Sequence, residues 1–371
     1  MNMRNLLLSL LLLGVLPVCA QGEKSPEDGF RWKLIGRVFF DGGVFINDTL
    51  DFGHAFHVND IRLGSVVTIG KGWDAKIELG YGNGKVSLKD VYLGYALGEH
   101  RFRLGYQYEP FGNARVGTAN YRFMQNATAD NVFGDSRKLG ISYSYDHEWM
   151  NIMAGVFSGG DMQGNVKMDQ GYSLAAKFIG RPWTGERQLL HLAVAPRFSS
   201  GQETATFNGG VPTMLLNKSE NGFADATLDG VINQWKLDLE CIMIYRKWML
   251  QGQYLFSHLN RREEENFNGQ GGYVQASFLI LGGGHNYNRQ TGMLGNPEKG
   301  SLELLARYDC VDLNDGDVLG GKLSDITVGM NYFINKYIAA KINYTRMMPG
   351  ESSPLGGKGF DLLQARVQFN F

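Results

Sequence analysis

The feature that most constrains this chain is a two-residue alternation that recurs along almost its whole length. In one stretch, for example, Phe102 and Leu104 alternate with Arg101 and Arg103. Successive side chains of a β-strand point to opposite faces, so this period indicates strands. The links between such stretches are often short and rich in glycine, as at residues 82–84. The pattern predicts an antiparallel meander without helices of heptad or amphipathic spacing.

We interpret the alternation as about sixteen strands, an even number within the range of membrane barrels. The predicted strands are at 32–40, 61–69, 73–81, 86–96, 101–108, 138–145, 151–157, 170–179, 189–197, 232–241, 248–257, 271–280, 301–312, 324–333, 337–345 and 360–371.

The N-terminus reads as a secretory signal peptide. Arg4 is followed by an apolar core at residues 6–15, and the segment ends on the small residue Ala20. We expect cleavage after Ala20. The alternative is lipidation of Cys19, for which Val18 is a bulky preceding residue. The other two cysteines lie far apart within predicted strands, so they do not indicate a disulfide framework.

The composition fits a membrane barrel. The formal net charge of −1 excludes a strongly basic nucleic-acid binder, and no apolar run after the N-terminus approaches the ~20 residues of a membrane helix. On most strands one face is nearly free of charge while the other carries Arg, Lys, Asp and Glu. We therefore expect residues 1–20 to be removed and residues 21–371 to form one domain. That domain is predicted to be an all-β, transmembrane, antiparallel β-barrel surrounded by outer-membrane lipid.

The lengths of the links between strands indicate how the barrel is oriented in the membrane. Long links are expected on the outer side, at 110–136, 199–230 and 346–359, and short ones on the inner side, at 70–72, 97–100, 146–150 and 334–336. Long outside and short inside is the asymmetry of bacterial barrels. One exception is the segment 281–300, which is long and yet falls on the inner side.

The long insert at residues 110–136 carries both aromatic and basic side chains. Loops of this length between paired strands are uncommon and usually functional. Because the insert is too apolar for a solvated tail, we expect it to fold into the lumen as a constriction loop. Its aromatic residues would contact the wall, and Arg115 and Arg122, with Tyr121 between them, would face the water path.

The last predicted strand ends the chain on Phe371. A C-terminal strand that closes on phenylalanine is similar to the signal read by the outer-membrane insertion machinery. We therefore expect Phe371 to be an assembly signal, and the insertion machinery to be a partner of the chain.

Several short motifs occur in a specific order along the mature chain. They are Gly36-Arg37; Lys89-Asp90-Val91-Tyr92-Leu93-Gly94-Tyr95; Gly105-x-Gln107-x-Glu109-Pro110-Phe111; Phe123-Met124; Arg137-Lys138-Leu139-Gly140; Glu303-Leu304-Leu305-Ala306-Arg307-Tyr308; Asp312-Leu313-Asn314-Asp315; and Phe369-Asn370-Phe371.

With these motifs the chain resembles the phosphate-selective porin O and P family over nearly all of its mature length. The resemblance implies a trimeric sixteen-stranded barrel with an inward-folded third outer loop and a basic lumen that guides anions. Two positions depart from the family, because Gln125-Asn126 follows Phe-Met where Glu-Arg is common. The arginine expected to bind phosphate is therefore missing there, and Arg115 or Arg122 would have to replace it.

Charged side chains on the predicted lumen face are the candidate pore residues. Those singled out are Arg37, Arg62, Arg101, Arg103, Lys138 and Asp90, together with Arg115, Tyr121 and Arg122 of the insert. In one interpretation the arginines form an unpaired ladder that attracts anions in a narrow passage. In the other they pair with carboxylates across strands, which stiffens the wall and leaves little net field.

No catalytic, cofactor-binding or metal-binding constellation is predicted. His54 and His57 lack a third ligand, and the acidic turn at 312–317 lacks the glutamate of a calcium loop. We therefore expect a non-enzymatic porin in the outer membrane of a Gram-negative bacterium. It would pass small hydrophilic solutes and lean toward anions such as phosphate. The alternatives are a surface-exposed binding protein or adhesin, supported by the long 199–230 loop, and a hydrolase built on a barrel.

Overall fold

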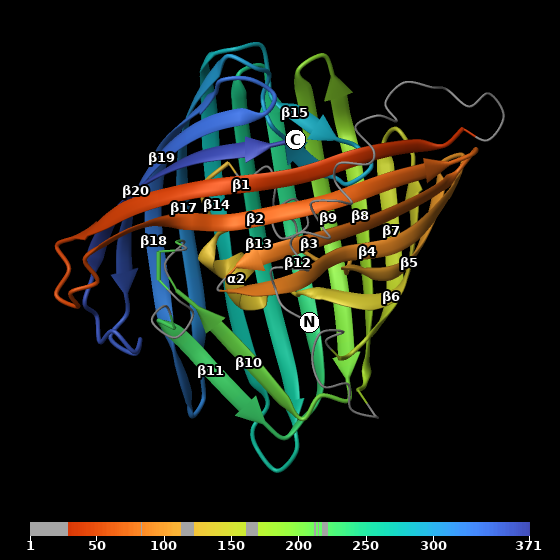
Figure 1. Ribbon diagram of the computed structural model, residues 1–371. Helices are drawn as coiled ribbons and strands as arrows, with labels where there is room; N and C mark the ends of the chain where they lie inside the picture. The colour runs from red at the N-terminus through yellow and green to blue at the C-terminus, as the bar shows by residue number, and fades with distance from the viewer. Residues whose placement is uncertain are drawn as a thin grey trace.

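Sixteen long strands form a closed antiparallel barrel (Figure 1). The computed structural model describes residues 29–82, 84–112, 122–160, 170–210, 213, 215–216 and 222–371. Wall strands that follow one another along the chain are also neighbours in the barrel. The first strand pairs with the last, with Arg37 opposite Asn370, and this pairing closes the sheet.

The strands of the wall are β1 (Arg31–Ile46), β2 (His54–Ile69), β3 (Trp73–Gly82), β4 (Lys85–Leu97), β5 (His100–Tyr108), β6 (Arg137–Asp146), β7 (Met150–Ser158), β8 (Tyr172–Gly185), β9 (Gln188–Ser200), β12 (Val231–Tyr245), β13 (Trp248–Arg261), β14 (Phe267–Leu281), β17 (Ser301–Asp315), β18 (Val318–Phe333), β19 (Ile338–Pro349) and β20 (Phe360–Asn370).

The strand count predicted from the alternation is confirmed. The outer face of the wall is apolar, as Leu104 and Ile141 illustrate with 56% and 59% exposure, whereas Glu303 and Asp309 are buried inside. This distribution is the reverse of that in a soluble sandwich and fits a wall that meets lipid on the outside. No helix among the described residues is long and apolar enough to cross a bilayer.

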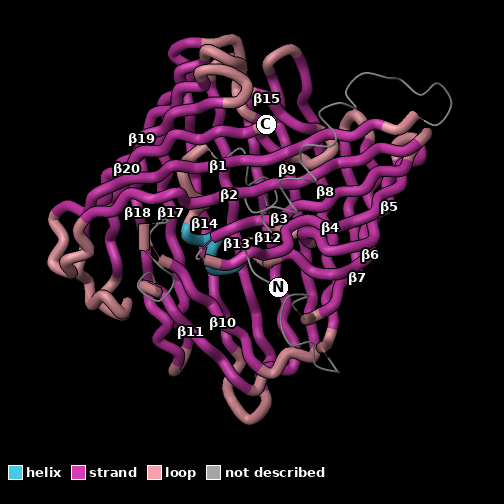
Figure 2. Tube along the Cα trace, viewed as in Figure 1, coloured by secondary structure: helices cyan, strands magenta, loops and turns pink. Residues whose placement is uncertain are grey.

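Three further elements of the described chain are additions to the predicted meander. They are the helix α2 (Thr128–Phe133), the hairpin β10 (Thr204–Gly209) with β11 (Ala224–Asp229), and the hairpin β15 (Asn286–Asn288) with β16 (Met293–Gly295). Figure 2 shows α2 as a short helical segment among strands. A helix of six residues is too short to produce a visible period and depends on tertiary contacts.

The two ends of the barrel differ, as the link lengths predict. Turns of two to four residues join strands at one rim, for example at 186–187 and 246–247, and we call this rim the short-turn end. The opposite rim, the long-loop end, carries the β10–β11 hairpin. The one long link at the short-turn end, residues 282–300, contains the β15–β16 hairpin, which lies in Figure 1 at the end of the barrel opposite the β10–β11 hairpin.

Phe371 completes the seam between the first and last strands. Its backbone N–H donates to the Gly36 carbonyl at 3.0 Å and its carbonyl accepts from the Gly36 N–H at 3.1 Å. The Phe371 ring lies over Gly36, where an added Cβ would come within 2.4 Å of a ring carbon. The same Cβ would come within 2.8 Å of the Arg62 carbonyl oxygen, so position 36 favours glycine.

Candidate pore and its lining

The third link at the long-loop end, residues 109–136, is named L3 here, and its described part lies inside the barrel. The backbone N–H of Met124 donates to Oδ1 of Asn343 at 2.9 Å, and Nδ2 of Asn331 donates to the Arg122 carbonyl at 2.7 Å. Both asparagines face inward from the wall. The predicted inward fold of this loop is confirmed for these residues. Arg115 and Tyr121 lie outside the described residues.

A wall carboxylate caps the helix within L3. Asp309 of β17 accepts the backbone N–H groups of Thr128 and Ala129, the latter at 3.2 Å. The first N–H groups of a helix have no partner inside the helix, so a carboxylate at this position stabilises it. The start of α2 is thereby attached directly to the barrel wall.

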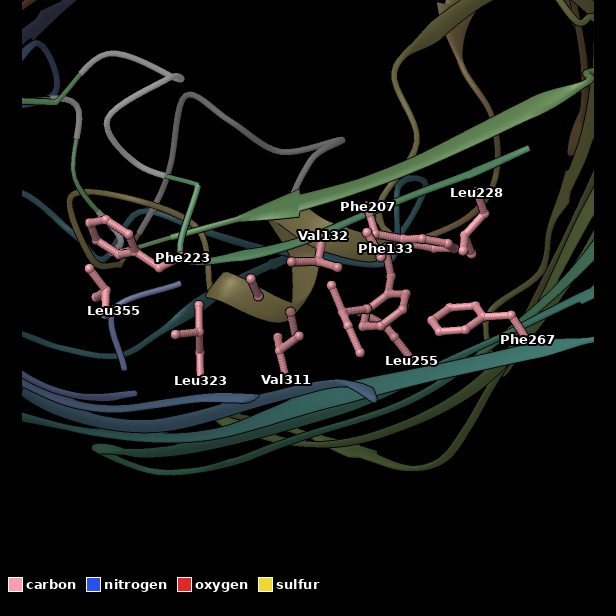
Figure 3. Packing of buried hydrophobic residues seen from close by; sticks show 14 of the residues in the cluster. Val132, Phe133, Phe207, Phe223, Leu228, Leu255, Phe267, Val311, Leu323 and Leu355 are labelled. Carbon is pink, nitrogen blue, oxygen red and sulfur yellow. The ribbon is translucent and has the colours of Figure 1, made fainter. Parts of the chain in front are cut away.

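The other side of α2 is held by apolar packing. Phe133 is fully buried, and its ring centroid is 5.6 Å from that of Phe207 on β10 (Figure 3). Phe207 in turn contacts Phe267 of β14 at 5.6 Å. The cluster continues along the inner wall through Leu255 and Val311. L3, the β10–β11 hairpin and the inner face of β13 to β20 thus form one apolar core inside the barrel.

Basic residues of the wall also hold L3 in place. Nζ of Lys236 donates to the Phe133 carbonyl at 2.9 Å and to Asp135 at 3.0 Å. Nε of Arg197 contacts Glu109 at 2.8 Å and Asp135 at 3.1 Å. Burial opposes ionisation of Asp135, but the charges of Arg197 and Lys236 outweigh it and hold the pKa of this carboxyl well below its usual range.

At Gln125-Asn126, where the sequence departs from the family, the loop backbone is bound by an arginine of the wall. Nη1 of Arg307 donates to the Gln125 carbonyl at 3.2 Å, and Nη2 donates to that of Asn126 at 3.5 Å. The Arg307 guanidinium also lies over the Phe123 ring at 4.5 Å. A wall arginine therefore binds the loop backbone at the place where the family commonly has an arginine of its own.

A ladder of charges lines the inner face of β1 to β6. Its successive contacts are Arg37 with Asp60, Asp60 with Arg62 at 3.1 Å, Arg62 with Glu78 at 3.5 Å, Glu78 with Lys76 at 2.6 Å, Lys76 with Asp90 at 2.6 Å, and Asp90 with Arg137. Each of the three carboxylates is shared by two cations, so four cations face three carboxylates.

The geometry of this ladder matches the paired interpretation for Arg37, Arg62 and Asp90. Arg101 also has a carboxylate nearby, Asp74, at 3.6 Å. Such cross-strand pairs order the wall and weaken the field of each cation.

The remaining predicted residues have different surroundings. Nζ of Lys138 lies 3.9 Å from Glu109 at the start of L3. Arg122 is only 5% exposed, with Nε 3.3 Å from Glu303. The expectation that Arg122 faces open water is therefore corrected: the part of L3 that carries it is pressed against the wall, where Glu303 and Asn331 hold it.

Arg103 and Lys89 of the inner face have no ion pair with a carboxylate among the described residues. The guanidinium of Arg103 lies over the Tyr92 ring at 4.6 Å, and its Nε has no hydrogen-bond partner. Lys89 lies over Gly80, where an added Cβ would come within 2.4 Å of its Cε.

Sequence reasoning missed Lys89 as a lumen residue because simple alternation gives Lys89 and Asp90 to opposite faces. A register shift in the β3–β4 pairing, next to Ile77, brings both inside. The only sequence feature that pointed to Lys89 was its place at the start of the family motif Lys89-Asp90.

The β15–β16 hairpin folds from the short-turn end into the lumen. The hydroxyl of Tyr287 is 2.7 Å from Nδ1 of His191, and burial raises the pKa of Tyr287 to about 12. Asn151 donates to the Gln290 carbonyl at 2.9 Å, and Arg181 to the Arg289 carbonyl at 3.4 Å. These contacts attach the hairpin to the inner face of β7 to β9, a feature that the sequence indicated only by the length of 281–300.

A cavity of about 230 Å³ runs between this hairpin and L3. Arg101, Arg103 and Ser142 line it from the wall, Arg289 from the hairpin and Glu109 from L3. The Arg289 side chain is 52% exposed and is 3.3 Å from Asp146. The full lining holds four Arg or Lys side chains, Arg101, Arg103, Lys177 and Arg289, and three carboxylates, Glu99, Glu109 and Asp146.

Among the described residues, no three His, Cys, Asp or Glu side chains are placed to hold a metal ion. The thiols of Cys241 and Cys310 are both free.

Comparison with known proteins identifies the family. The sequence profile of the phosphate-selective porin O and P family matches residues 37–371. The chain belongs to this family. It is therefore a porin, and its barrel lies in the outer membrane of a Gram-negative bacterium with the short-turn end toward the periplasm.

Individual relatives are distant in sequence. A protein of Caulobacter vibrioides is 23% identical over 380 residues, which cover 96% of this chain and 76% of that protein. Among solved structures, the anion-selective porin from Comamonas acidovorans has a TM-score of 0.61 and 13% identity, and covers 92% of this chain and 100% of its own. The outer membrane channel DcaP of Acinetobacter baumannii has a TM-score of 0.60 and 14% identity, with 94% and 99% covered. These structures share the fold.

Proposed function

We propose that the mature chain, residues 21–371, is a channel that lets small hydrophilic solutes diffuse through the outer membrane and that prefers anions such as phosphate. The observation that carries the proposal is the excess of cations on the inner face of β1 to β6. The ladder on β1 to β6 holds four cations for three carboxylates, and Lys89 and Arg103 add two cations without a carboxylate partner among the described residues. In a narrow passage such cations raise the local concentration of anions.

Two comparisons support the proposal. The family is described as phosphate-selective, and a structure with the same fold is described as an anion-selective porin. The role proposed is transport and not catalysis. We also propose a homotrimer, because a solved structure of the same fold, OmpT of Vibrio cholerae, is described as a trimer form.

The test is the reversal potential of the purified porin in a planar bilayer under a KCl gradient. We expect the wild type to show anion preference, and the double variant Lys89→Gln/Arg103→Gln to lower the anion-to-cation permeability ratio by about two- to five-fold. The matched control is Lys358→Gln, which removes one exposed cation from the last long loop and should leave the ratio unchanged. A cation-selective wild type would overturn the proposal.

A further inference from the structure

Two segments that enter the barrel from opposite ends meet at a histidine. His285 lies at the base of the β15–β16 hairpin, and its Nδ1 is 3.5 Å from Nη2 of Arg122 in L3. Glu303 of β17 lies beside both, with Oε1 3.3 Å from Nε of Arg122 and 3.7 Å from Nδ1 of His285. All three side chains are buried, with exposures of 3% or less.

The hydrogen bonds of His285 define its protonation state. Its Nε2 is 3.0 Å from the Lys247 carbonyl, which can only accept, so Nε2 carries the proton. Nδ1 is then a lone-pair acceptor directed at the Arg122 guanidinium, which can only donate. The contacts are satisfied by a neutral imidazole and not by an imidazolium.

We propose that His285 is a positioning residue for Arg122, and that a proton on Nδ1 releases Arg122 and loosens the contact between L3 and the β15–β16 hairpin. A protonated Nδ1 can no longer accept from Arg122. It becomes a donor 3.7 Å from Oε1 of Glu303, and two neighbouring cations then compete for one carboxylate. Nε and Nη1 of Arg122 make no hydrogen bond to other described residues, so the guanidinium is then held by its ion pair with Glu303, for which the imidazolium competes.

The charges around the histidine set the pH at which this occurs. Arg122 faces it from L3 and Glu303 from β17, and Lys341 of β19 interacts electrostatically with both. Burial, followed by the positive charge of Arg122, lowers the pKa of His285 below its ordinary 6.5. The contribution of neutral His285 to the contact between L3 and the hairpin is therefore fully present above pH 6.5. It is lost as the pH falls through the lower pKa that His285 has in the folded protein.

Single-channel conductance in a planar bilayer tests the proposal across a series from about pH 8 to about pH 5 at constant salt. The wild type should show a reversible one-proton transition with its midpoint below 6.5, complete within about two pH units. His285→Gln should remove it, because glutamine can still donate to Lys247 and accept from Arg122 but takes up no proton. His258→Gln is the control, since the described partners of His258 are Asn260 and Asn268 at the long-loop end.

A second variant separates this switch from titration elsewhere in the lumen. Glu303→Gln removes the carboxylate that favours the imidazolium, so it should move the transition to lower pH. A wild type without a transition, or a transition that survives in His285→Gln, would overturn the inference. Neither result bears on anion preference, which is measured near pH 8 from the reversal potential.

Discussion

Asp309 faces the lumen from β17, and its carboxylate accepts two backbone N–H groups of α2. Arg307 and Lys236 likewise bind carbonyls of L3, at 3.2 Å and 2.9 Å. Along β12 to β20, then, charged side chains of the wall are used to hold the loop. Along β1 to β6 they pair mainly with each other. Residue type alone does not separate these uses, because both parts of the wall show the same alternation.

At this scale we predict that Asp309→Ala weakens the anchoring of α2 by about 1 kcal/mol, the usual contribution of a helix cap. The measurement is the temperature at which the folded barrel converts to the slower-migrating unfolded form in gel electrophoresis. Asp309→Asn is the matched control. It removes the same charge, and with it the repulsion from Asp325 on the neighbouring strand, but keeps an acceptor for the helix. Equal temperatures for both variants would show that the cap contributes nothing.

At the scale of elements, the lumen is narrowed from both ends. L3 and the β10–β11 hairpin fill one side of the long-loop end with an apolar core, and the β15–β16 hairpin enters from the short-turn end. Tyr287 and Leu294 of that hairpin pack on a small cluster that includes Ile242 and Met249 of the inner wall. The hairpin is therefore packed against the inner wall and forms part of the lining of the passage.

We predict that replacing residues 286–295 with a short Gly-Ser linker raises single-channel conductance, because it removes the hairpin wall of the cavity. The variant keeps His285 and every strand of the barrel, so assembly should be preserved. A linker of the same composition in place of 262–266, which joins β13 to β14 at the long-loop end, serves as the control. If conductance is unchanged in the first variant, the main path does not pass the hairpin.

At the scale of the whole molecule, the barrel has no free edge. The backbone of Phe371 pairs with Gly36 across the seam, and the rest of β20 pairs with β1 from Arg37 onward. Closed barrels satisfy every backbone group within the wall, which explains their resistance to detergent.

We predict that the mature protein extracted in mild detergent is a heat-modifiable trimer. Deletion of Phe371 should lower the amount of assembled barrel several-fold while export to the periplasm is unchanged, because the deletion removes both seam hydrogen bonds to Gly36. Assembled protein in the outer membrane, quantified by unheated electrophoresis, is the readout. Normal assembly without Phe371 would rule out its role as an assembly signal.

The sequence by itself determined the wall. The alternation at period two is a local property of each strand, so it predicted the number of strands, their inner and outer faces and the unequal ends. It also marked 110–136 and 281–300 as segments too long for simple turns. What it could not predict was which lumen charges meet each other, since the contact of Thr128 with Asp309 joins residues 181 positions apart.

Only the tertiary structure decided the contents of the lumen. Barrel closure brings L3 against β17 to β20 and the β15–β16 hairpin against β7 to β9, and this placement buries Arg122 beside His285 and Glu303. The register shift that turns Lys89 inward likewise depends on the pairing of β3 with β4. The physical reason is that the wall is specified by short-range periodicity, whereas the pore depends on contacts between segments that are far apart in the chain.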